Sequence, residues 1–344
     1  MILRNLSLQN FRSYTKASFD FSDTTTIIIG PNGIGKSNLI EAVFLLATGK
    51  SFRAEKEVQL ISFGKKTLRV EGEIEEEKKL EIVFVDQETG FLKKKYLVNG
   101  VSKRRADFAG HIAAVLFTPA DLDLVSGQPS NRRRFLDEVL EQVDVDYRIA
   151  HATYTKALRQ RNALLSLAQE TGRRNEKQFE YWDELLIRTG NVITEKREEL
   201  IKVINEQKKD FFDCILFYDK STISTQRLEQ YEAAEIGAGV TLVGPHRDDI
   251  LFKISGEKDA RYFASRGQQR LIVLEMKIFE INFMKEKTGK NPILFLDDIF
   301  SELDDKNIGK ILGIMNHHQA IITTTHKEFV ENASLKEVKM IELK

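Results

Sequence analysis

The pattern of apolar and polar residues divides the chain into stretches of different character. Residues 1–118 combine two-residue alternation with short apolar runs, which predicts strands with helical insertions. From about Asn131 to Phe212 proline is absent and helical spacing dominates, as in "RRRFLDEVLEQV". Alternation returns in "VTLVG" and "DILFKIS", and the chain then runs helix, strand, helix, strand to "QAIITTTH". Strands that alternate with helices predict a parallel sheet.

This pattern predicts an α/β domain built from two halves of the sequence, with a helical subdomain inserted between them. We assign residues 1–118 and 241–344 to the α/β head and residues 119–240 to the mainly helical insertion. Within the first half, "TLRVEGEIEEEKKLEIVFVD" and "KKKYLVNGVSKR" predict antiparallel strands, and Asn99-Gly100 suits a type I′ hairpin turn. The sheet is therefore expected to be mixed, with an antiparallel β subdomain.

Composition narrows the class of protein without identifying a partner. Hydrophobic residues make up 42% and charged residues 30% of the 344 residues, which is typical of a soluble globular protein. Lys plus Arg and Asp plus Glu each number 52, so the zero net charge neither indicates nor excludes nucleic acid. Cys214, the single cysteine, is expected to be a buried small hydrophobe in a reducing compartment. No signal core and no run near ~18 apolar residues is present, so we expect a cytoplasmic protein without membrane contact.

The clearest chemical motif is "GPNGIGKS", residues 30–37, which follows the apolar run "TTTIII" and precedes a helical pattern. It matches G-x-x-x-x-G-K-[ST] at every fixed position. Backbone N–H groups of such a loop surround a phosphate, Lys36 can reach the β- and γ-phosphates, and Ser37 can coordinate Mg²⁺. A chance glycine-rich turn would not need a strand before it and a helix after it. The predicted nucleotide-binding residues are Gly30, Pro31, Asn32, Gly33, Ile34, Gly35, Lys36, Ser37 and Asn38.

Two adjacent carboxylates follow another apolar run, in "ILFLDD". Asp297 is the predicted second ligand of Mg²⁺, and Asp298 is placed to polarise an attacking water. Two neighbouring carboxylates repel each other unless a cation lies between them. The alternative is a helix N-cap pair after a strand, which the nearby P-loop motif disfavours.

Two further candidates lie beyond these carboxylates. Asp304 in "SELDDKN" comes seven residues after Asp297, and His326 follows the apolar strand "AIITTT". That strand is expected to be parallel to "ILFLDD", and ligands bind at the carboxyl ends of such strands. His326 is therefore a candidate hydrogen-bond donor to a γ-phosphate.

The turn "SRGQ", Ser265 to Gln268, begins a helical pattern about 30 residues before Asp297. Two interpretations are open: an ordinary helix N-cap, or a phosphate-binding turn at a helix N-terminus. Together with the motifs above, the turn resembles the signature of ATP-binding-cassette ATPases and, within them, the heads of SMC proteins. That resemblance implies that Ser265, Gly267 and Gln268 bind the γ-phosphate held by a second subunit.

Longer motifs resemble the RecF family of bacterial recombinational repair ATPases. They are "LQNFRSY", "FTPADLDLVSGQPSNRRRFLD" at 117–137, "GPHRDD" at 244–249, "FASRGQQR" and "FLDDIFSELD", in the family's order over residues 1 to about 330. The resemblance implies ATP and Mg²⁺ as cofactors and Lys36, Asp298 and His326 as catalytic residues. It assigns further nucleotide contacts to Asp304, Ser265, Gly267 and Gln268. No glutamine near residues 119–121 is assigned to the loop that senses Mg²⁺.

The resemblance also implies partners. An ATP-dependent homodimer would clamp double-stranded DNA near junctions with single-strand gaps and would help RecO and RecR to load RecA. Slow, weakly DNA-stimulated ATP hydrolysis would reopen it. An SMC-like ATPase module of a defence or other DNA-processing system is the alternative, and a fused nuclease domain would favour it. Only some 18 residues follow His326. The inserted helical region disfavours a transporter cassette.

Two basic clusters allow more than one interpretation. Arg132 to Arg134 form either a solvated or ion-paired helix face or a contact to nucleotide or to a partner head. Residues 93–95 ("KKK") and 103–105 ("KRR") flank the predicted hairpin and either follow a DNA backbone or pair with the glutamates of 75–77. The stretch "TGRRNEKQ" is expected to be an exposed loop between helices.

Overall fold

The computed structural model describes residues 2–75, 78–87, 91–299, 305–325 and 338–343, with the side chains of 305 and 306 excepted. The chain forms two compact units. The first comprises Met1–Asp121 and Glu280–Lys344, and the second comprises Leu122–Phe279. Helix α9 (Arg266–Thr288) runs from the second unit into the first. Among the described residues, none of the helices is both long and apolar enough to cross a bilayer.

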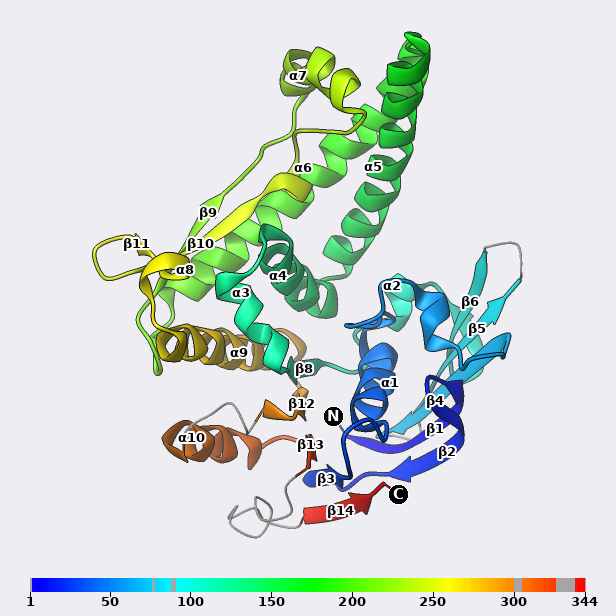
Figure 1. Cartoon of the computed structure of the whole chain (residues 1–344), viewed down its shortest axis with the longest axis vertical. Coiled ribbons are helices and arrows are strands. Elements are labelled where there is room, and N and C mark those ends of the chain that lie inside the picture. The colour runs from blue at the N-terminus through cyan, green and yellow to red at the C-terminus, as the bar shows by residue number, and fades with distance from the viewer. Residues whose placement is uncertain (1, 76–77, 88–90, 300–304, 326–337, 344) are drawn as a thin grey trace. The chain divides into compact units, whose positions relative to one another are not determined.

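The first unit contains a five-stranded parallel sheet in the order β14-β3-β13-β12-β8 (Figure 1). All residues of its strands β3, β8 and β13 are buried. Parallel strands covered on both faces read as continuous apolar runs, which is why the sequence pattern found most of them. The strands are β3 (Thr25–Ile29), β8 (Ala114–Phe117), β12 (Ile293–Asp297), β13 (Ala320–Thr324) and β14 (Val338–Glu342).

A six-stranded antiparallel sheet completes this unit, in the order β2-β1-β4-β5-β6-β7. Asn99 and Gly100 have φ of 49° and 77° at the β6–β7 turn, so the predicted hairpin is confirmed. The strands are β1 (Leu3–Phe11), β2 (Tyr14–Asp20), β4 (Thr67–Ile74), β5 (Lys78–Asp86), β6 (Leu92–Val98) and β7 (Val101–Lys103).

Helix α1 (Lys36–Thr48) packs against both sheets and joins them into one hydrophobic core. Leu45 and Leu46 of the helix share this core with Val70 of the antiparallel sheet and Ile321 of the parallel sheet. Gly49 ends the helix in the left-handed conformation, as the sequence predicted. The unit also contains α2 (Arg105–Phe108) and α10 (Asp305–Met315).

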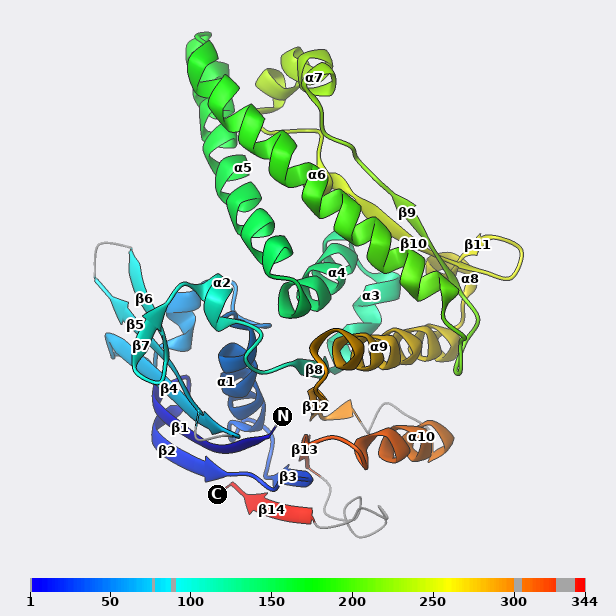
Figure 2. The same ribbon diagram turned by 180° about the vertical axis from the view of Figure 1, so that it is seen from behind.

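The second unit is mainly helical, as predicted for the region from about Asn131 to Phe212. The long helices α5 and α6 lie side by side (Figures 1 and 2). Helix α5 ends at Thr171 and α6 begins at Glu176, and residues 171–173 of this connection are exposed, as predicted. The helices are α3 (Asp123–Ser126), α4 (Pro129–Val143), α5 (Val145–Thr171), α6 (Glu176–Glu206), α7 (Thr225–Ala238) and α8 (Ala260–Phe263).

A three-stranded sheet, β11-β10-β9, lies in the second unit and runs along α6 in Figure 2. Its strands are β9 (Ile215–Asp219), β10 (Asp249–Ile254) and β11 (Lys258–Asp259). The predicted strand "VTLVG" is wrong, because side chains rather than a strand bind its backbone. Asn162 accepts a hydrogen bond from the Thr241 N–H at 2.9 Å, and Glu235 accepts one from the Leu242 N–H at 2.8 Å.

The compact units divide the chain differently from the predicted domains. The helical unit begins at Leu122, near the predicted residue 119, but it ends at Phe279 instead of residue 240. The physical reason is that β10 pairs with β9 and α8 packs on β10, so the chain stays in this unit beyond residue 240. The predicted architecture, an α/β fold with an antiparallel subdomain and an inserted helical region, is confirmed.

Candidate nucleotide-binding site

The glycine-rich loop lies between β3 and α1, where the sequence placed it. Pro31, Asn32 and Gly33 are exposed at its tip. Gly35 caps α1 with φ 114° in the left-handed region. A Cβ at this position would lie 2.9 Å from the Ser13 Oγ and 3.1 Å from the Tyr14 hydroxyl, so only glycine fits. The loop thus presents backbone to solvent at the N-terminus of a helix, the arrangement that binds anions.

Lys36 points its ammonium back at the same loop. Its Nζ donates to the carbonyl oxygens of Gly30 at 2.7 Å and Pro31 at 3.0 Å, and the residue is 7% exposed. These neutral carbonyls accept hydrogen bonds from the ammonium but do not balance its charge. Phosphate oxygens would do both, because charge-assisted hydrogen bonds are stronger than neutral ones.

Strand β12 brings its terminal carboxylate to the first turn of α1. The Ser37 Oγ donates to the Asp297 Oδ1 at 2.9 Å, although the two residues are 260 positions apart. Asp298 follows with φ 54°, a left-handed conformation that Asp tolerates better than most residues. The sequence therefore placed Lys36, Ser37, Asp297 and Asp298 correctly relative to the ends of their strands and helix.

Thr323 on β13 is a residue of this site that sequence reasoning missed. Its hydroxyl donates to the Asp297 Oδ1 at 2.7 Å and accepts from the Asp298 N–H at 3.2 Å. The only sequence signal was its position three residues before His326 in "AIITTTH".

The residues present fit ATP with Mg²⁺. Ser37 and Asp297 offer a hydroxyl and a carboxylate oxygen 2.9 Å apart, and both are hard ligands. Mg²⁺ typically takes one or two protein ligands and completes its shell with water and substrate phosphates. The described residues contain no cluster of three or more His, Cys, Asp or Glu side chains that could hold a metal ion.

The N-terminal "FRSY" stretch packs directly beside the glycine loop. The Tyr14 hydroxyl donates to the Gly35 carbonyl at 3.1 Å, and the Ser13 Oγ accepts from the Asn38 Nδ2 at 2.9 Å. Arg12 donates to both oxygens of Glu41, at 2.9 and 2.7 Å. These contacts tie the N-terminal stretch to the loop and to α1.

Glu41 is fully buried in the same helix and is held by two arginines. Besides Arg12, Arg53 pairs with it at 3.0 Å and the Ser51 Oγ donates to it at 2.6 Å. Burial alone would raise the pKa of Glu41, but the hydrogen bonds and charges of Arg12, Ser51 and Arg53 outweigh burial and lower it. A buried carboxylate thus stays ionised one turn after Ser37.

The turn at Ser265 begins α9 with a reciprocal pair of hydrogen bonds. The Gln268 N–H donates to the Ser265 Oγ at 3.3 Å, and the Ser265 N–H donates to the Gln268 Oε1 at 2.8 Å. This is a capping box, so the N-cap interpretation describes the turn within one chain. All four residues of the turn, including Gly267, are exposed, and they belong to the second compact unit. Asp304 and His326 lie outside the described residues.

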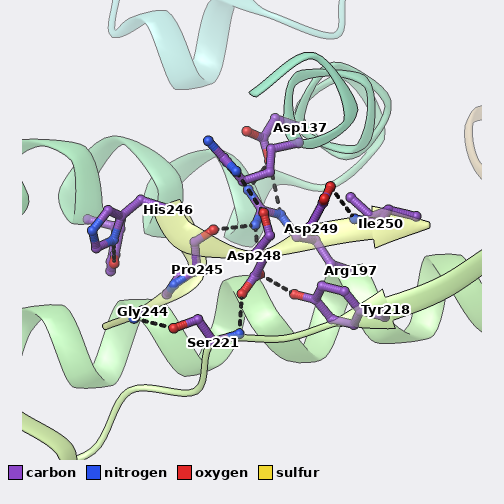
Figure 3. Close-up of polar contacts among 12 residues, drawn as sticks. Asp137, Arg197, Tyr218, Ser221, Gly244, Pro245, His246, Asp248, Asp249 and Ile250 are labelled. Carbon is purple, nitrogen blue, oxygen red and sulfur yellow. Dashed lines mark hydrogen bonds and ion pairs between the residues drawn. The ribbon is translucent and has the colours of Figure 1, made fainter. Parts of the chain in front are cut away.

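The "GPHRDD" segment belongs to a buried polar network in the helical unit (Figure 3). Arg197 of α6 lies at its centre and donates to the Asp137 Oδ1 at 2.7 Å and the Asp248 Oδ2 at 3.0 Å. Asp248 also accepts hydrogen bonds from the Tyr218 hydroxyl and the Ser221 N–H. Each charged group in this network is therefore matched by another group of the same unit.

Two of the three arginines of 132–134 connect to the same segment. Arg132, 1% exposed, pairs with Asp249 at 2.7 and 3.1 Å, and Arg133 donates to the Asp248 carbonyl at 2.7 Å. Arg134 pairs with Glu138 on the surface of α4. Arg132 and Arg134 are therefore ion-paired, as the first interpretation predicted, and Arg132 joins two motifs more than 100 residues apart.

The basic hairpin is partly paired. Lys94 pairs with Glu57, and Arg104 pairs with Asp107 at 2.8 Å. Lys93, Lys95 and Lys103 are exposed. Of the glutamates of 75–77, which the sequence offered as partners, 76 and 77 lie outside the described residues.

Comparison with known proteins shows which sequences this chain resembles. The model of the RecF/RecN/SMC N-terminal domain family matches residues 2–343. DNA replication and repair protein RecF of Natranaerobius thermophilus is 36% identical over 95% of this chain and 92% of its own length. RecF of Moorella thermoacetica is 38% identical over 94% of this chain and 90% of its own.

Solved structures give the same result. The recombination mediator RecF with ATPrS in the RecFOR pathway matches with a TM-score of 0.87 and 30% identity over 99% of this chain and 96% of that one. The corresponding RecF–ATP structure matches at 0.85 and 32%, over 94% and 92%. An Smc head domain from Pyrococcus yayanosii, at 0.52 and 16% over 99% and 94%, is similar in fold alone. This chain belongs to the RecF family.

Proposed function

We propose that this chain is an ATP-hydrolysing, DNA-binding protein of recombinational repair. The observation that carries the proposal is the 2.9 Å contact between Ser37, behind the glycine loop, and Asp297 at the end of β12. It joins the two halves of a P-loop ATPase site across the sequence. The names of its relatives, DNA replication and repair proteins with ATP-bound structures, support the same function.

The residues of the site divide into four roles. Lys36 and the backbone of residues 30–38 bind the phosphates, and Ser37 with Asp297 hold Mg²⁺. Bound Mg²⁺ would neutralise charge on the β- and γ-phosphates. Asp298 orients and polarises the attacking water, and His326 and Asp304 complete the γ-phosphate contacts by resemblance to the family.

The exposed turn at Ser265 serves a second copy of the chain. Ser265, Gly267 and Gln268 of one head contact the γ-phosphate held by Lys36 of the other, so ATP closes a homodimer. The closed dimer clamps double-stranded DNA near junctions with single strands, and slow hydrolysis reopens it. Exposed Lys93, Lys95 and Lys103 supply charge for the DNA backbone, and RecR with RecO are the protein partners.

The decisive experiment measures assembly by light scattering with ATP, Mg²⁺ and DNA, in wild type and two variants. Lys36→Ala removes the phosphate contact within a head, and Ser265→Arg blocks the shared contact while leaving its own P-loop intact. We expect each variant to stay monomeric and to hydrolyse little ATP.

Mixing the two variants provides the internal control. A mixed dimer contains one complete site, with Ser265 of one chain facing Lys36 of the other. We therefore expect partial DNA-stimulated hydrolysis from the mixture and none from either parent. Full hydrolysis and ATP-dependent dimerisation by Ser265→Arg alone would overturn the shared site.

A further inference from the structure

The buried threonine of β13 lies at the point where the two acidic residues of the site begin. Thr323 is 0% exposed, and its strand runs between β3, which leads into the glycine loop, and β12, which ends at Asp297. In the parallel ladder, Thr323 stands opposite Asp297 on one side and Ile28 on the other. The residue therefore lies between the two strands that carry the site.

The hydroxyl of Thr323 uses both of its hydrogen-bonding functions on this pair. As a donor it reaches the Asp297 Oδ1 at 2.7 Å, and as an acceptor it receives the Asp298 N–H at 3.2 Å. The Thr323 carbonyl also accepts from the Asp298 N–H at 3.3 Å. One side chain thus restrains the carboxylate of the first acid and the backbone of the second.

Both restraints act on features that would otherwise vary. The Asp297 carboxylate can rotate about its terminal torsion, which has broad preferences. Asp298 sits at φ 54°, a conformation that costs energy unless the surroundings enforce it. Ser37 contacts the same Asp297 Oδ1, so the threonine and the serine together fix that oxygen.

A threonine that merely suited a strand would not need these contacts. Thr26 on β3 is equally buried, and its Oγ1 accepts a hydrogen bond from the Ser22 N–H at 2.9 Å. Thr26 therefore fills a strand position and satisfies local backbone. Thr323 instead directs its hydroxyl to two acids with proposed roles in chemistry.

We propose that Thr323 is a positioning residue for ATP hydrolysis: its hydroxyl fixes the Asp297 carboxylate for Mg²⁺ and holds the Asp298 backbone in its left-handed conformation. This inference rests on the proposed function of the site. Loss of a group that orients a metal ligand typically weakens metal affinity or activity by about 10- to 100-fold.

The test replaces Thr323 with valine, which keeps the shape and removes the hydroxyl. A fluorescent ATP analogue measures nucleotide affinity first in EDTA and then during titration with Mg²⁺, and a separate assay measures kcat. We expect wild-type affinity in EDTA, a Mg²⁺ half-saturation raised about 10-fold or more, and a kcat lowered by a similar factor. Thr323→Ser, which restores the hydroxyl, should recover most of both.

Thr26→Val is the matched control, because it also removes a buried threonine hydroxyl from the parallel sheet. It should leave the Mg²⁺ half-saturation and kcat near wild type. If valine at position 323 lowers the melting temperature, Thr323→Cys gives a second test, since a thiol is a weaker donor of similar size. A Mg²⁺ response that stays wild type in both variants would overturn the inference.

The proposed function fails in a different way. If wild-type protein binds no nucleotide with Mg²⁺, the ATPase assignment itself is wrong, whatever Thr323 does. If wild type binds and hydrolyses ATP and Thr323→Val matches it, only the positioning role is wrong.

Discussion

The glycine-loop site and the Arg197 network both gather charged side chains, but they hold them in opposite ways. Arg197 lies between two carboxylates, and those carboxylates have further donors from the same unit. Within the described part of the chain, Lys36 donates to neutral carbonyls of its own loop. A network of matched charges holds the fold together, whereas a lysine held by carbonyls can exchange them for a ligand.

This difference explains why the family-like motifs of this chain form two groups: those at the proposed nucleotide site and those that pair with each other inside the protein. The tip of the glycine loop is exposed, and Asp297 at the end of β12 is half-buried. The "RRRFLD" and "GPHRDD" stretches are matched to each other through Arg132 and Asp249 and through Asp137, Arg197 and Asp248. A sequence motif therefore indicates residues that interact. Only their contacts in the folded protein show whether they bind a ligand or another part of the same chain.

The largest effect is expected from breaking the matched network. Arg197→Met leaves Asp137 and Asp248 buried without their cation, and breaking a buried ion pair in this way costs about 3–5 kcal/mol. Urea unfolding followed by the fluorescence of Trp182, the single tryptophan and a residue of α6, measures this loss.

Arg188→Met is its control, because Arg188 is exposed on the same helix. Its free energy of unfolding should stay within about 0.5 kcal/mol of wild type. Equal losses in both variants would show that the Arg197 network is not the reason for the effect.

Lys36→Ala should weaken ATP binding while leaving the stability of the fold nearly unchanged. Removing the ammonium should lower ATP affinity at least ~100-fold, or about 2.7 kcal/mol, because charge-assisted contacts to phosphate are lost. The melting temperature should change little, since the carbonyls of Gly30 and Pro31 belong to a loop that water can reach. Isothermal titration with ATP measures the affinity.

Lys79→Ala provides the comparison for this variant. Lys79 lies in the same unit and pairs with Glu71 on the exposed face of the antiparallel sheet. It should retain full ATP affinity. A Lys36→Ala protein with wild-type affinity would remove the distinction between the two charged regions.

The network should also respond to pH through His246. The His246 Nε2–H donates to the Thr241 carbonyl at 3.1 Å, and in the neutral ring Nδ1 accepts from the Tyr154 hydroxyl at 2.7 Å. Burial, together with the charges of Arg247, Arg133 and Arg161, lowers its pKa to about 4. Between pH 6.5 and about 4 the unfolded chain therefore binds a proton that the folded chain does not.

Stability should consequently fall as pH drops through this window. The contribution of His246 between pH 7.5 and 5 is about 2 kcal/mol. His246→Gln keeps a donor and an acceptor but cannot take up a proton, so its unfolding free energy should fall less than that of wild type over this range. If the unfolding free energies of the two proteins fall equally between pH 7.5 and 5, His246 does not titrate in this way.

The smallest effect is expected at the signature turn. Ser265→Ala removes the cap of α9 and should cost about 1 kcal/mol of unfolding free energy.

Gln268→Glu keeps the capping box but adds negative charge beside the proposed phosphate. It should keep wild-type stability and lose ATP-dependent dimerisation in light scattering. Wild-type dimerisation by Gln268→Glu would leave the turn as a cap alone.

Local sequence was sufficient for most of the fold. The glycine loop was predictable because strand, loop and helix are contiguous, and Asn99-Gly100 because a two-residue turn contains its own geometric requirement. "VTLVG" was mispredicted because side chains, and not a neighbouring strand, bind its backbone N–H groups: Asn162 from 79 positions away and Glu235 from 7 positions away. Strand β9 was missed because its exposed face carries Ile215 and Phe217, which hide the expected alternation.

The sequence by itself determined which strand ends carry the proposed site residues, because apolar runs followed by Lys36 or by Asp297 are local patterns. Only the tertiary structure decided which distant groups meet. It paired Arg132 with Asp249 and brought Thr323 to the two acids, 26 and 25 positions away from it. Hydrogen bonds need an approach of about 3 Å, and the folded sheet, rather than proximity along the chain, sets that approach.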